Sequence, residues 1–382
     1  MNHIAATVAP VAAPVAARWI VNRRFDLLWF FGGSLLSLAA LGLYFGFGVS
    51  ILALFWIWLL GFDGPHIAAA FTRTYVDLQE WRTRRGMLLF SLLAFAVGPA
   101  CLVLNAVTGS DAPFLGFLAL SAVYGYYHIV RQHYGFLALY KSVARDFGRL
   151  DLHLDRWCLY AGLWLPYFYF LFTHPRARAE MGMGAVVGPV EGFVLAAVGA
   201  AWGLSLLLYV GRTIQRFGAS AHRPQVWYFL VTVGLHGIIY FFIATFEPVY
   251  AKSNGPDQDF LLISVVTTLF HNIQYLGLVW FHNHNRYGEP VDDFGPARVV
   301  NRSAGHYLLA CGAFSFVYLL LACWTGVFPG CQVFMNMKIG GATGSQIGLS
   351  LWWGLALHHY YLDQKIWRVK GDPRLRKNLG LG

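Results

Sequence analysis

Eight histidines lie in four short segments that also carry aspartate, asparagine, glutamine and tyrosine. They are His66 in FDGPH, His128 and His133 in HIVRQH, His271, His282 and His284 in HNIQYLGLVWFHNH, and His358 and His359 in HHYYLD. Imidazole is the commonest metal ligand in proteins and suits Zn, Cu, Fe and Ni. A structural zinc needs four ligands and a haem two axial ones, so eight histidines favour a site for two metal ions.

Two aspartates have the spacing needed to support such ligands. Asp63 precedes His66 by three residues, and Asp363 follows His359 by four, so each carboxylate shares a helix face with its histidine. A ligating imidazole usually donates its other N–H to a carboxylate or carbonyl. We therefore expect Asp63 and Asp363 to orient the ligands and to take part in catalysis; pairing of Asp363 with the basic residues that follow it is the alternative.

The elements that carry these residues are transmembrane helices. Of 382 residues, 57% are hydrophobic and 12% charged, with a mean hydropathy of +0.52, whereas globular domains carry roughly 25% charged residues. The apolar blocks approach the ~20 residues that cross ~30 Å of hydrocarbon, and they lack the alternation of an outer-membrane barrel. We predict an all-α bundle of ten spans, at about 25–47, 49–71, 86–108, 113–140, 154–173, 185–210, 225–246, 259–282, 306–328 and 343–363.

The basic residues orient this bundle. On the side of the two termini, the tails and loops hold 23 Lys and Arg, and the loops of the other side hold 4. This asymmetry predicts cytoplasmic termini. The remaining basic residue, Arg131, lies within a span, where we expect it to pair with a buried carboxylate or to bind an anionic substrate head group in catalysis. Seven of the eight histidines fall near cytoplasmic helix ends, and His271 lies deeper.

The chain divides into a membrane domain and two tails. We expect a disordered cytoplasmic tail over 1–22, one membrane domain over 23–368 and a basic cytoplasmic tail over 369–382. No separable soluble domain and no signal peptide is indicated, and the integral protein is expected in the plasma membrane, as in the inner membrane of a bacterium.

Other chemistries find little support in the residues. The net charge of +10 accompanies no DNA- or RNA-binding motif, so nucleic acid is not an expected partner. Five cysteines without CxxC spacing predict neither a disulfide framework nor a zinc–thiolate site; four lie in apolar runs and Cys331 in a loop. His174, His236 and His306 lack neighbouring ligand types and are left out of the site.

The histidine pattern resembles that of the membrane dimetal oxygenases, which include fatty-acid desaturases, hydroxylases and alkane hydroxylases. His128 and His133 match the HxxxxH spacing of that group, and His358-His359 is similar to half of its HxxHH box. The resemblance covers the four histidine segments and not the rest of the chain. It implies two metal ions, iron first with copper or zinc as alternatives, and oxidation of C–H bonds with O₂.

We therefore predict an O₂-activating monooxygenase, hydroxylase or desaturase that acts on a hydrophobic or lipid-like substrate entering from the membrane lipids. Electrons would come from a cytoplasmic donor, because the chain has no flavin or nicotinamide motif. One alternative is a transporter or permease with a histidine relay, although such sites usually lie near the midplane between repeated halves. Another is a lipid-modifying transferase with histidine as general base and arginines holding a phosphate head group.

Overall fold

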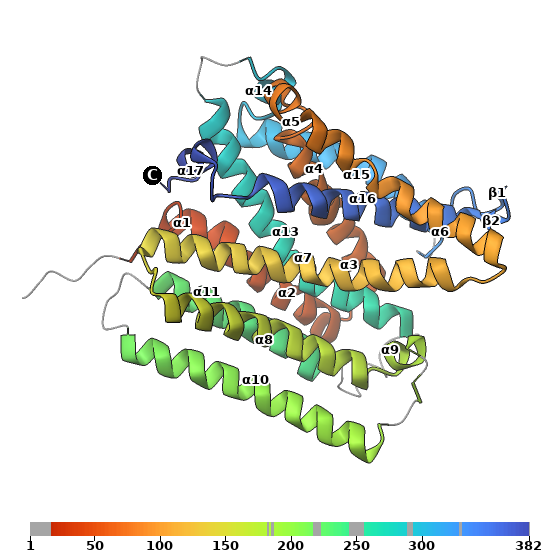
Figure 1. Ribbon diagram of the computed structural model, residues 1–382, viewed down its shortest axis with the longest axis horizontal. Helices are drawn as coiled ribbons and strands as arrows, with labels where there is room; N and C mark the ends of the chain where they lie inside the picture. The colour runs from red at the N-terminus through yellow and green to blue at the C-terminus, as the bar shows by residue number, and fades with distance from the viewer. Residues whose placement is uncertain are drawn as a thin grey trace, which may run out of the picture.

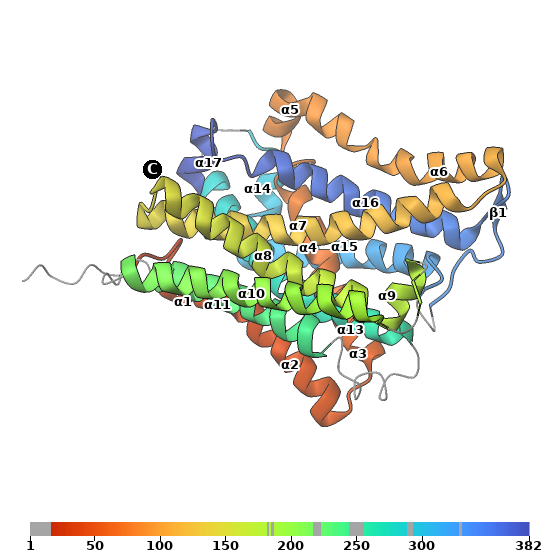
Figure 2. The ribbon, with the colours of Figure 1, turned by 60° about the horizontal axis from the view of Figure 1, so that its bottom comes forward.

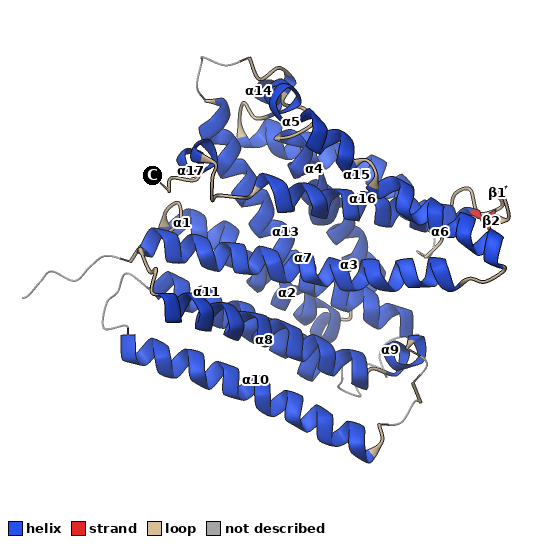
Figure 3. Cartoon of the chain, viewed as in Figure 1, coloured by secondary structure: helices blue, strands red, loops and turns tan. Residues whose placement is uncertain are grey.

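The computed structural model is helical almost throughout (Figure 3). It describes residues 17–181, 183–184, 187–216, 223–243, 256–288, 293–327 and 331–381. Among these, eight helices are long and apolar enough to cross a membrane, which is typical of an integral membrane protein. They run Arg23–Phe47, Ile51–Thr72, Leu78–Thr108, Ala112–Ala144, Pro189–Arg216, Arg223–Ile243, Leu261–Tyr287 and Ala304–Trp324.

Several of these candidate spans are built from more than one helical piece. The α-helical pieces of the eight spans are α1 (Arg23–Phe25), α2 (Gly32–Phe47), α3 (Ile51–Trp58), α4 (Gly64–Thr72), α5 (Leu78–Ser91), α6 (Ala94–Thr108), α7 (Ala112–Ala144), α10 (Pro189–Arg216), α11 (Arg223–Gly237), α13 (Pro256–Tyr287) and α15 (Ala304–Trp324). Three π-helical turns complete them: η1 (Asp26–Phe31), η2 (Leu59–Asp63) and η4 (Ile238–Ile243). The other elements are α8 (Arg149–Thr173), α9 (Pro175–Glu180), α14 (Pro296–Val300), β1 (Lys338–Ile339), β2 (Ala342–Thr343), α16 (Gly344–Ile366) and α17 (Pro373–Asn378).

Two predicted spans, 154–173 and 343–363, correspond to long helices that are not among the eight. The first is α8, which begins with charged residues, and the second is α16, which ends in the HHYYLD segment. Both pack within the bundle (Figures 1 and 2). The all-helical architecture is confirmed, with eight helices that could cross a membrane, whereas a count of ten spans and the cytoplasmic side of the termini remain predictions.

Helix α13 occupies the centre of the bundle. In its most apolar stretch 83% of the residues are buried, against 17% in the corresponding stretches of Leu78–Thr108 and Pro189–Arg216. It packs against α2, α3, α4 and α7, whereas α10 packs against α8 at one edge of the molecule (Figure 1). A polar side chain on α13 is therefore held among protein groups, while α6 and α10 face outward.

A π-helical turn sets the direction of the helix that carries His66. Pro65 has no N–H, so a carbonyl in the turn before it lacks a helical partner. The carbonyl of Leu60, five residues earlier, instead accepts a hydrogen bond from the hydroxyl of Ser315 on α15, at 2.8 Å. A Cβ on Gly64 would lie 2.7 Å from that hydroxyl oxygen, so only glycine allows the close approach of α4 and α15.

The cysteines correct one prediction. Cys323, at the end of α15, forms a disulfide with Cys331 in the following loop. The sequence predicts no disulfide, because Cys323 lies in an apolar run and its separation of eight residues from Cys331 gives no sign of pairing. Cys101, Cys158 and Cys311 are free.

The two predicted tails differ in what the structure describes. Residues 1–16 of the expected 1–22 tail lie outside the described residues. Within the expected 369–382 tail, α17 is an ordered helix, capped by Asp372, whose carboxylate accepts a hydrogen bond from the Leu375 N–H at 2.8 Å. Leu375 and Leu379 are buried against the bundle, so this segment covers the end of α13.

Candidate metal centre

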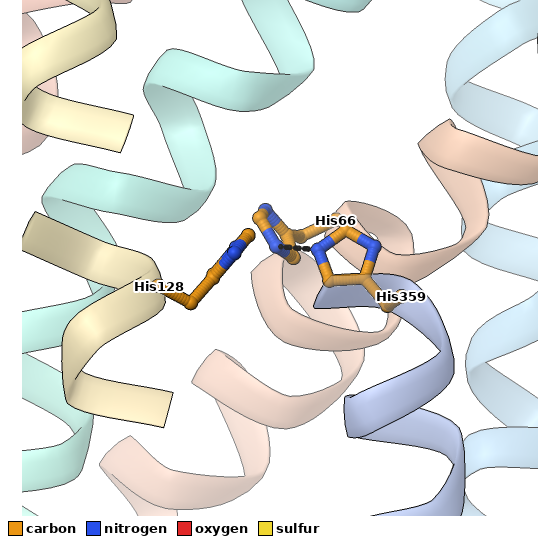
Figure 4. A group of neighbouring side chains, drawn as sticks. All are labelled: His66, His128 and His359. Carbon is orange, nitrogen blue, oxygen red and sulfur yellow. Dashed lines mark hydrogen bonds between the residues drawn. The ribbon is translucent and has the colours of Figure 1, made fainter. Parts of the chain in front are cut away.

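Three buried histidines from three helices point at one another. His66 on α4, His128 on α7 and His359 on α16 each offer one ring nitrogen, and these atoms all lie within 4.8 Å of one another (Figure 4). The Nε2 atoms of His66 and His359 are 2.8 Å apart. Segments nearly 300 residues apart in sequence therefore bring three metal-type ligands to one point.

A fourth predicted ligand, His271, lies beside them on α13. Its ring centroid is 4.7 Å from that of His66 and 4.9 Å from that of His128. All four side chains are buried. We call His66, His128, His271 and His359 the histidine cluster; each comes from a different helix.

The cluster fits a transition metal in donor chemistry and in spacing. Two nitrogens that bind one ion at about 2.0–2.1 Å each lie at most about 4.2 Å apart, so the three rings need only a small inward movement. Each of the four rings also has a nitrogen with no hydrogen-bond partner in the part of the chain that the structure describes. A buried polar atom without a partner is costly, and a bound metal would remove that cost for those nitrogens that face the centre.

Asp363 belongs to the same centre. Its Oδ2 lies 3.5 Å from His359 Nε2 and 3.7 Å from His128 Nε2. Its Oδ1 accepts a hydrogen bond from the Tyr275 hydroxyl at 2.5 Å. The carboxylate thus faces the inner nitrogens of two rings. Asp363 is therefore placed as an additional oxygen ligand or as a proton acceptor, and the expected role behind the outer nitrogen of His359 does not hold.

Asp63 differs from its predicted role. Its Oδ1 accepts a hydrogen bond from Asn272 at 3.1 Å and its Oδ2 one from the Tyr318 hydroxyl at 2.5 Å. No hydrogen bond joins it to His66 among the described residues, because Asn272 and Tyr318 take its two carboxylate oxygens. Asp63 instead ties the turn before His66 to α13 and α15.

His133 lies apart from the cluster, next to a histidine that the sequence analysis left out. Its Nδ1 is 2.9 Å from the Tyr228 hydroxyl, and its ring centroid is 5.3 Å from that of His236. The Nε2 atoms of both rings have no hydrogen-bond partner within the described ranges. One feature of the sequence could have identified His236. It is the only histidine in the apolar span 225–246, and ionisable residues within a membrane span usually mark function.

The other three predicted ligands also lie elsewhere. His358 packs on Tyr75, whose hydroxyl is 2.8 Å from its Nε2. His282 lies near the end of α13, with Nδ1 2.9 Å from Asn283 Oδ1 and Nε2 3.4 Å from the side-chain amide of Asn378. His284 is exposed beside Trp280. The eight histidines are thus divided among several sites.

Arg131 forms no ion pair with a carboxylate among the residues that the structure describes. Its guanidinium donates to the Tyr160 hydroxyl at 3.0 Å and lies 5.6 Å from the centroid of the Tyr134 ring. The residue is exposed on the outer side of α7. His128 on the same helix is buried whereas Arg131 is exposed, so neither a buried ion pair nor a role at the metal centre is supported.

Comparisons with protein-family models, with curated proteins and with solved structures find no match to this chain.

Proposed function

We propose that the protein is a membrane-embedded, metal-dependent oxidoreductase whose metal binds at the histidine cluster. The observation that carries this proposal is the convergence of three ligating nitrogens within 4.8 Å, from His66, His128 and His359. An imidazole set with one carboxylate suits Fe, Cu or Zn better than Mg or Ca. Iron or copper at this place would supply the activation and reduction of O₂ for an oxidation of a hydrophobic or lipid-like substrate.

The residues around the cluster suit that chemistry. Burial of the four rings excludes bulk water, which protects reactive species and strengthens electrostatic interactions. Tyr275 holds Asp363 through Oδ1, which leaves Oδ2 free to accept or return a proton beside His359. The ring of Tyr360 stacks on that of His128, with centroids 4.3 Å apart, and fixes its orientation.

A second metal ion of the predicted pair would bind at His133 and His236. Both rings are buried and present an Nε2 atom without a protein partner among the described residues. His236 Nδ1 lies 2.9 Å from the Thr232 carbonyl oxygen, which fixes the tautomer and leaves Nε2 as the lone-pair nitrogen. With two histidines rather than three, this site is expected to hold its ion more weakly than the cluster does.

The orientation of the protein completes the proposal. We infer that α8 and α16 also cross the membrane, which gives ten crossings with both termini in the cytoplasm. The distribution of basic residues supports this orientation. It places the Cys323–Cys331 disulfide on the outer side, where an oxidising compartment such as the bacterial periplasm allows disulfides to persist. An inner-membrane location is consistent with both features.

Metal analysis by mass spectrometry tests the proposal on full-length protein purified in detergent without chelators. We expect at least one iron or copper per chain, no Soret band in the absorption spectrum, and substrate-dependent O₂ consumption when a reductant is supplied. Protein from metal-replete cells that carries no metal would exclude the proposal. Zinc alone, with no O₂ consumption, would exclude the redox activity while retaining the site.

A further inference from the structure

A polar cavity of about 190 Å³ lies at the end of α13 beyond the histidine cluster. Four segments line it: the end of α4, the start of α5, the end of α13 and the segment of α17. The last three of these segments lie together in Figure 1. Its lining includes four arginines and two carboxylates, namely Arg73, Arg84, Arg286, Arg374, Glu80 and Asp372. We call this cavity the arginine pocket.

Two of the four arginines are neutralised by carboxylates. Arg84 pairs with Asp372 at 2.6 Å and lies 3.5 Å from Glu80. Arg286 pairs with Asp77 at 2.8 Å and lies 3.4 Å from Glu80. Neither Arg73 nor Arg374 forms an ion pair within the described part of the chain, so the pocket retains an excess of positive charge.

Arg73 is the unusual member of this group. Its side chain is only 4% exposed, and its Nε and one terminal nitrogen have no hydrogen-bond partner among the described residues. The other terminal nitrogen donates to the Ile366 carbonyl at 3.3 Å, and the guanidinium lies 4.1 Å from the centroid of the Trp367 ring. Burial lowers the pKa of Arg73, but a guanidinium stays charged in proteins. A buried cation with two free donors is costly unless an anion completes it.

We infer that the arginine pocket binds an oxyanion of the phosphate type, with the free donors of Arg73 as its anchor. Guanidinium groups bind phosphate through paired N–H donors in a fixed fork. Phosphate is favoured over a carboxylate because the pocket offers donors from four segments, and a tetrahedral anion accepts from more directions than a planar one. The lining is mainly polar, so the pocket holds the anionic group and not an apolar chain.

The phosphate can belong to a lipid head group or to a small soluble molecule. This inference goes beyond the proposed oxidation, since phosphate binding requires no metal. Two aromatic residues connect the pocket to the histidine cluster. The Trp367 ring, which packs on Arg73, has its centroid 6.0 Å from that of the Tyr275 ring, and the Tyr275 hydroxyl donates a hydrogen bond to Asp363. Loss of the metal at the cluster would leave phosphate binding in place.

Isothermal titration calorimetry on the full-length protein in detergent tests the inference, with inorganic phosphate in one arm and dioctanoyl phosphatidic acid in the other. We expect saturable binding in at least one arm. The Arg73→Met variant keeps an apolar stem against Trp367 and loses the donors; its affinity should fall about 10- to 100-fold, as expected for hydrogen bonds to a charged group. Arg82→Ala, an exposed arginine of α5 outside the lining, is the matched control and should bind like the unchanged protein.

Each outcome decides the matter. Binding of the lipid phosphate alone assigns the pocket to a head group, and binding of inorganic phosphate assigns it to a soluble ligand. Absence of binding in both arms, or equal affinities for Arg73→Met and Arg82→Ala, overturns the inference. If Arg73→Met does not fold, the exposed Arg374→Ala variant replaces it; an affinity within error of the unchanged protein overturns the inference, and a loss of about threefold, typical of a partly solvated charge, supports it.

Discussion

The histidine cluster and the arginine pocket both include residues of α13, but the cluster favours a cation and the pocket favours an anion. His271 and His282 of α13 are eleven residues apart, close to three helical turns, so both lie on one face of the helix. Around His271 the neighbours are three imidazoles and an aspartate held by a tyrosine. Around His282 they are arginines and carboxylates, with more arginines than carboxylates.

This difference shows that the spacing along α13 places the two histidines on one face of the helix, whereas the residues of the neighbouring helices determine which ion each site favours. At the cluster, α4, α7 and α16 each bring an imidazole nitrogen to one point, which favours a cation. At the pocket, α5 and α17 bring an excess of guanidinium groups, which favours an anion. Helix α13 thus contributes a histidine to each of two sites, one of which favours a cation and the other an anion.

The largest expected effect is loss of metal from the cluster alone. Replacing His66 and His359 together by alanine removes two of the three converging ligands, and we expect the metal bound at the cluster to fall below a tenth of its original content in mass spectrometry. Replacing His282 and His284 together also removes two histidines, but at the end of α13 outside the cluster, and metal content should stay unchanged.

The two double variants test whether the histidine cluster and the end of α13 are separate regions. Equal metal loss in both double variants would mean that the two regions share one site, and retention in both would mean that the cluster binds no metal. Circular dichroism and the elution volume in size-exclusion chromatography should match the unchanged protein in each case, so that unfolding does not stand in for metal loss.

Four of the eight histidines that the sequence predicts as ligands, His66, His128, His271 and His359, lie together in the structure. The sequence did not separate them from their neighbours in the chain. His128 and His133 are about 140° apart around a helix, and His358 and His359 about 100° apart. Only one residue of each pair can face a common centre, and deciding which one requires the packing of the neighbouring helices.

The apolar helices were predictable from hydropathy, whereas the side-chain partners were not. Asp63 accepts hydrogen bonds from Tyr318 on α15 and Asn272 on α13 and not from His66. His236 was missed because its partner, His133, lies on another helix about a hundred residues away. Both errors come from contacts between helices, which the periodicity of one segment does not contain.

An intermediate effect is expected from the tyrosine that holds Asp363. The Tyr275→Phe variant keeps the ring and removes the hydroxyl, so Asp363 loses its hydrogen bond and its fixed orientation toward His128 and His359. Outer-shell partners of this kind are typically worth 10- to 100-fold in metal affinity. Titration with a competing chelator should therefore show a metal affinity at least tenfold weaker.

A neighbouring tyrosine provides the control for that variant. Tyr307 is equally buried, and its hydroxyl donates to the Leu276 carbonyl at 3.1 Å instead of to a carboxylate. Tyr307→Phe should lower stability without weakening metal binding. If both variants weaken metal binding equally, the effect comes from packing of α13, and Asp363 has no separate part in the cluster.

The smallest effect is expected at the rim of the arginine pocket, from the pair Arg84 and Asp372. Burial of Asp372 opposes ionisation, yet the Leu375 N–H and the charge of Arg84 lower the pKa of the carboxyl group below its usual value. Because the folded-state pKa is lowered, the carboxylate stabilises the docked α17 above its ordinary pKa of about 3.9, and this contribution disappears as pH falls through the lowered pKa. Both side chains are partly exposed, so the ion pair contributes about 0.5–1 kcal/mol at most.

Hydrogen exchange of the α17 amides measures this contribution and separates the ion pair from the helix cap. Asp372→Asn retains the oxygen that caps α17 and loses the charge, so protection should fall slightly at neutral pH and lose most of its dependence on acid. Asp372→Ala also removes the cap, which costs about 1 kcal/mol more. Arg82 and Asp293 form an ion pair with side chains 67% and 65% exposed, and Asp293→Asn should leave α17 unchanged. If the protection of the α17 amides in Asp372→Asn depends on pH as it does in the unchanged protein, α17 is held in place by its buried leucines alone. The ion pair between Arg84 and Asp372 would then make no contribution to the position of α17 beside the arginine pocket.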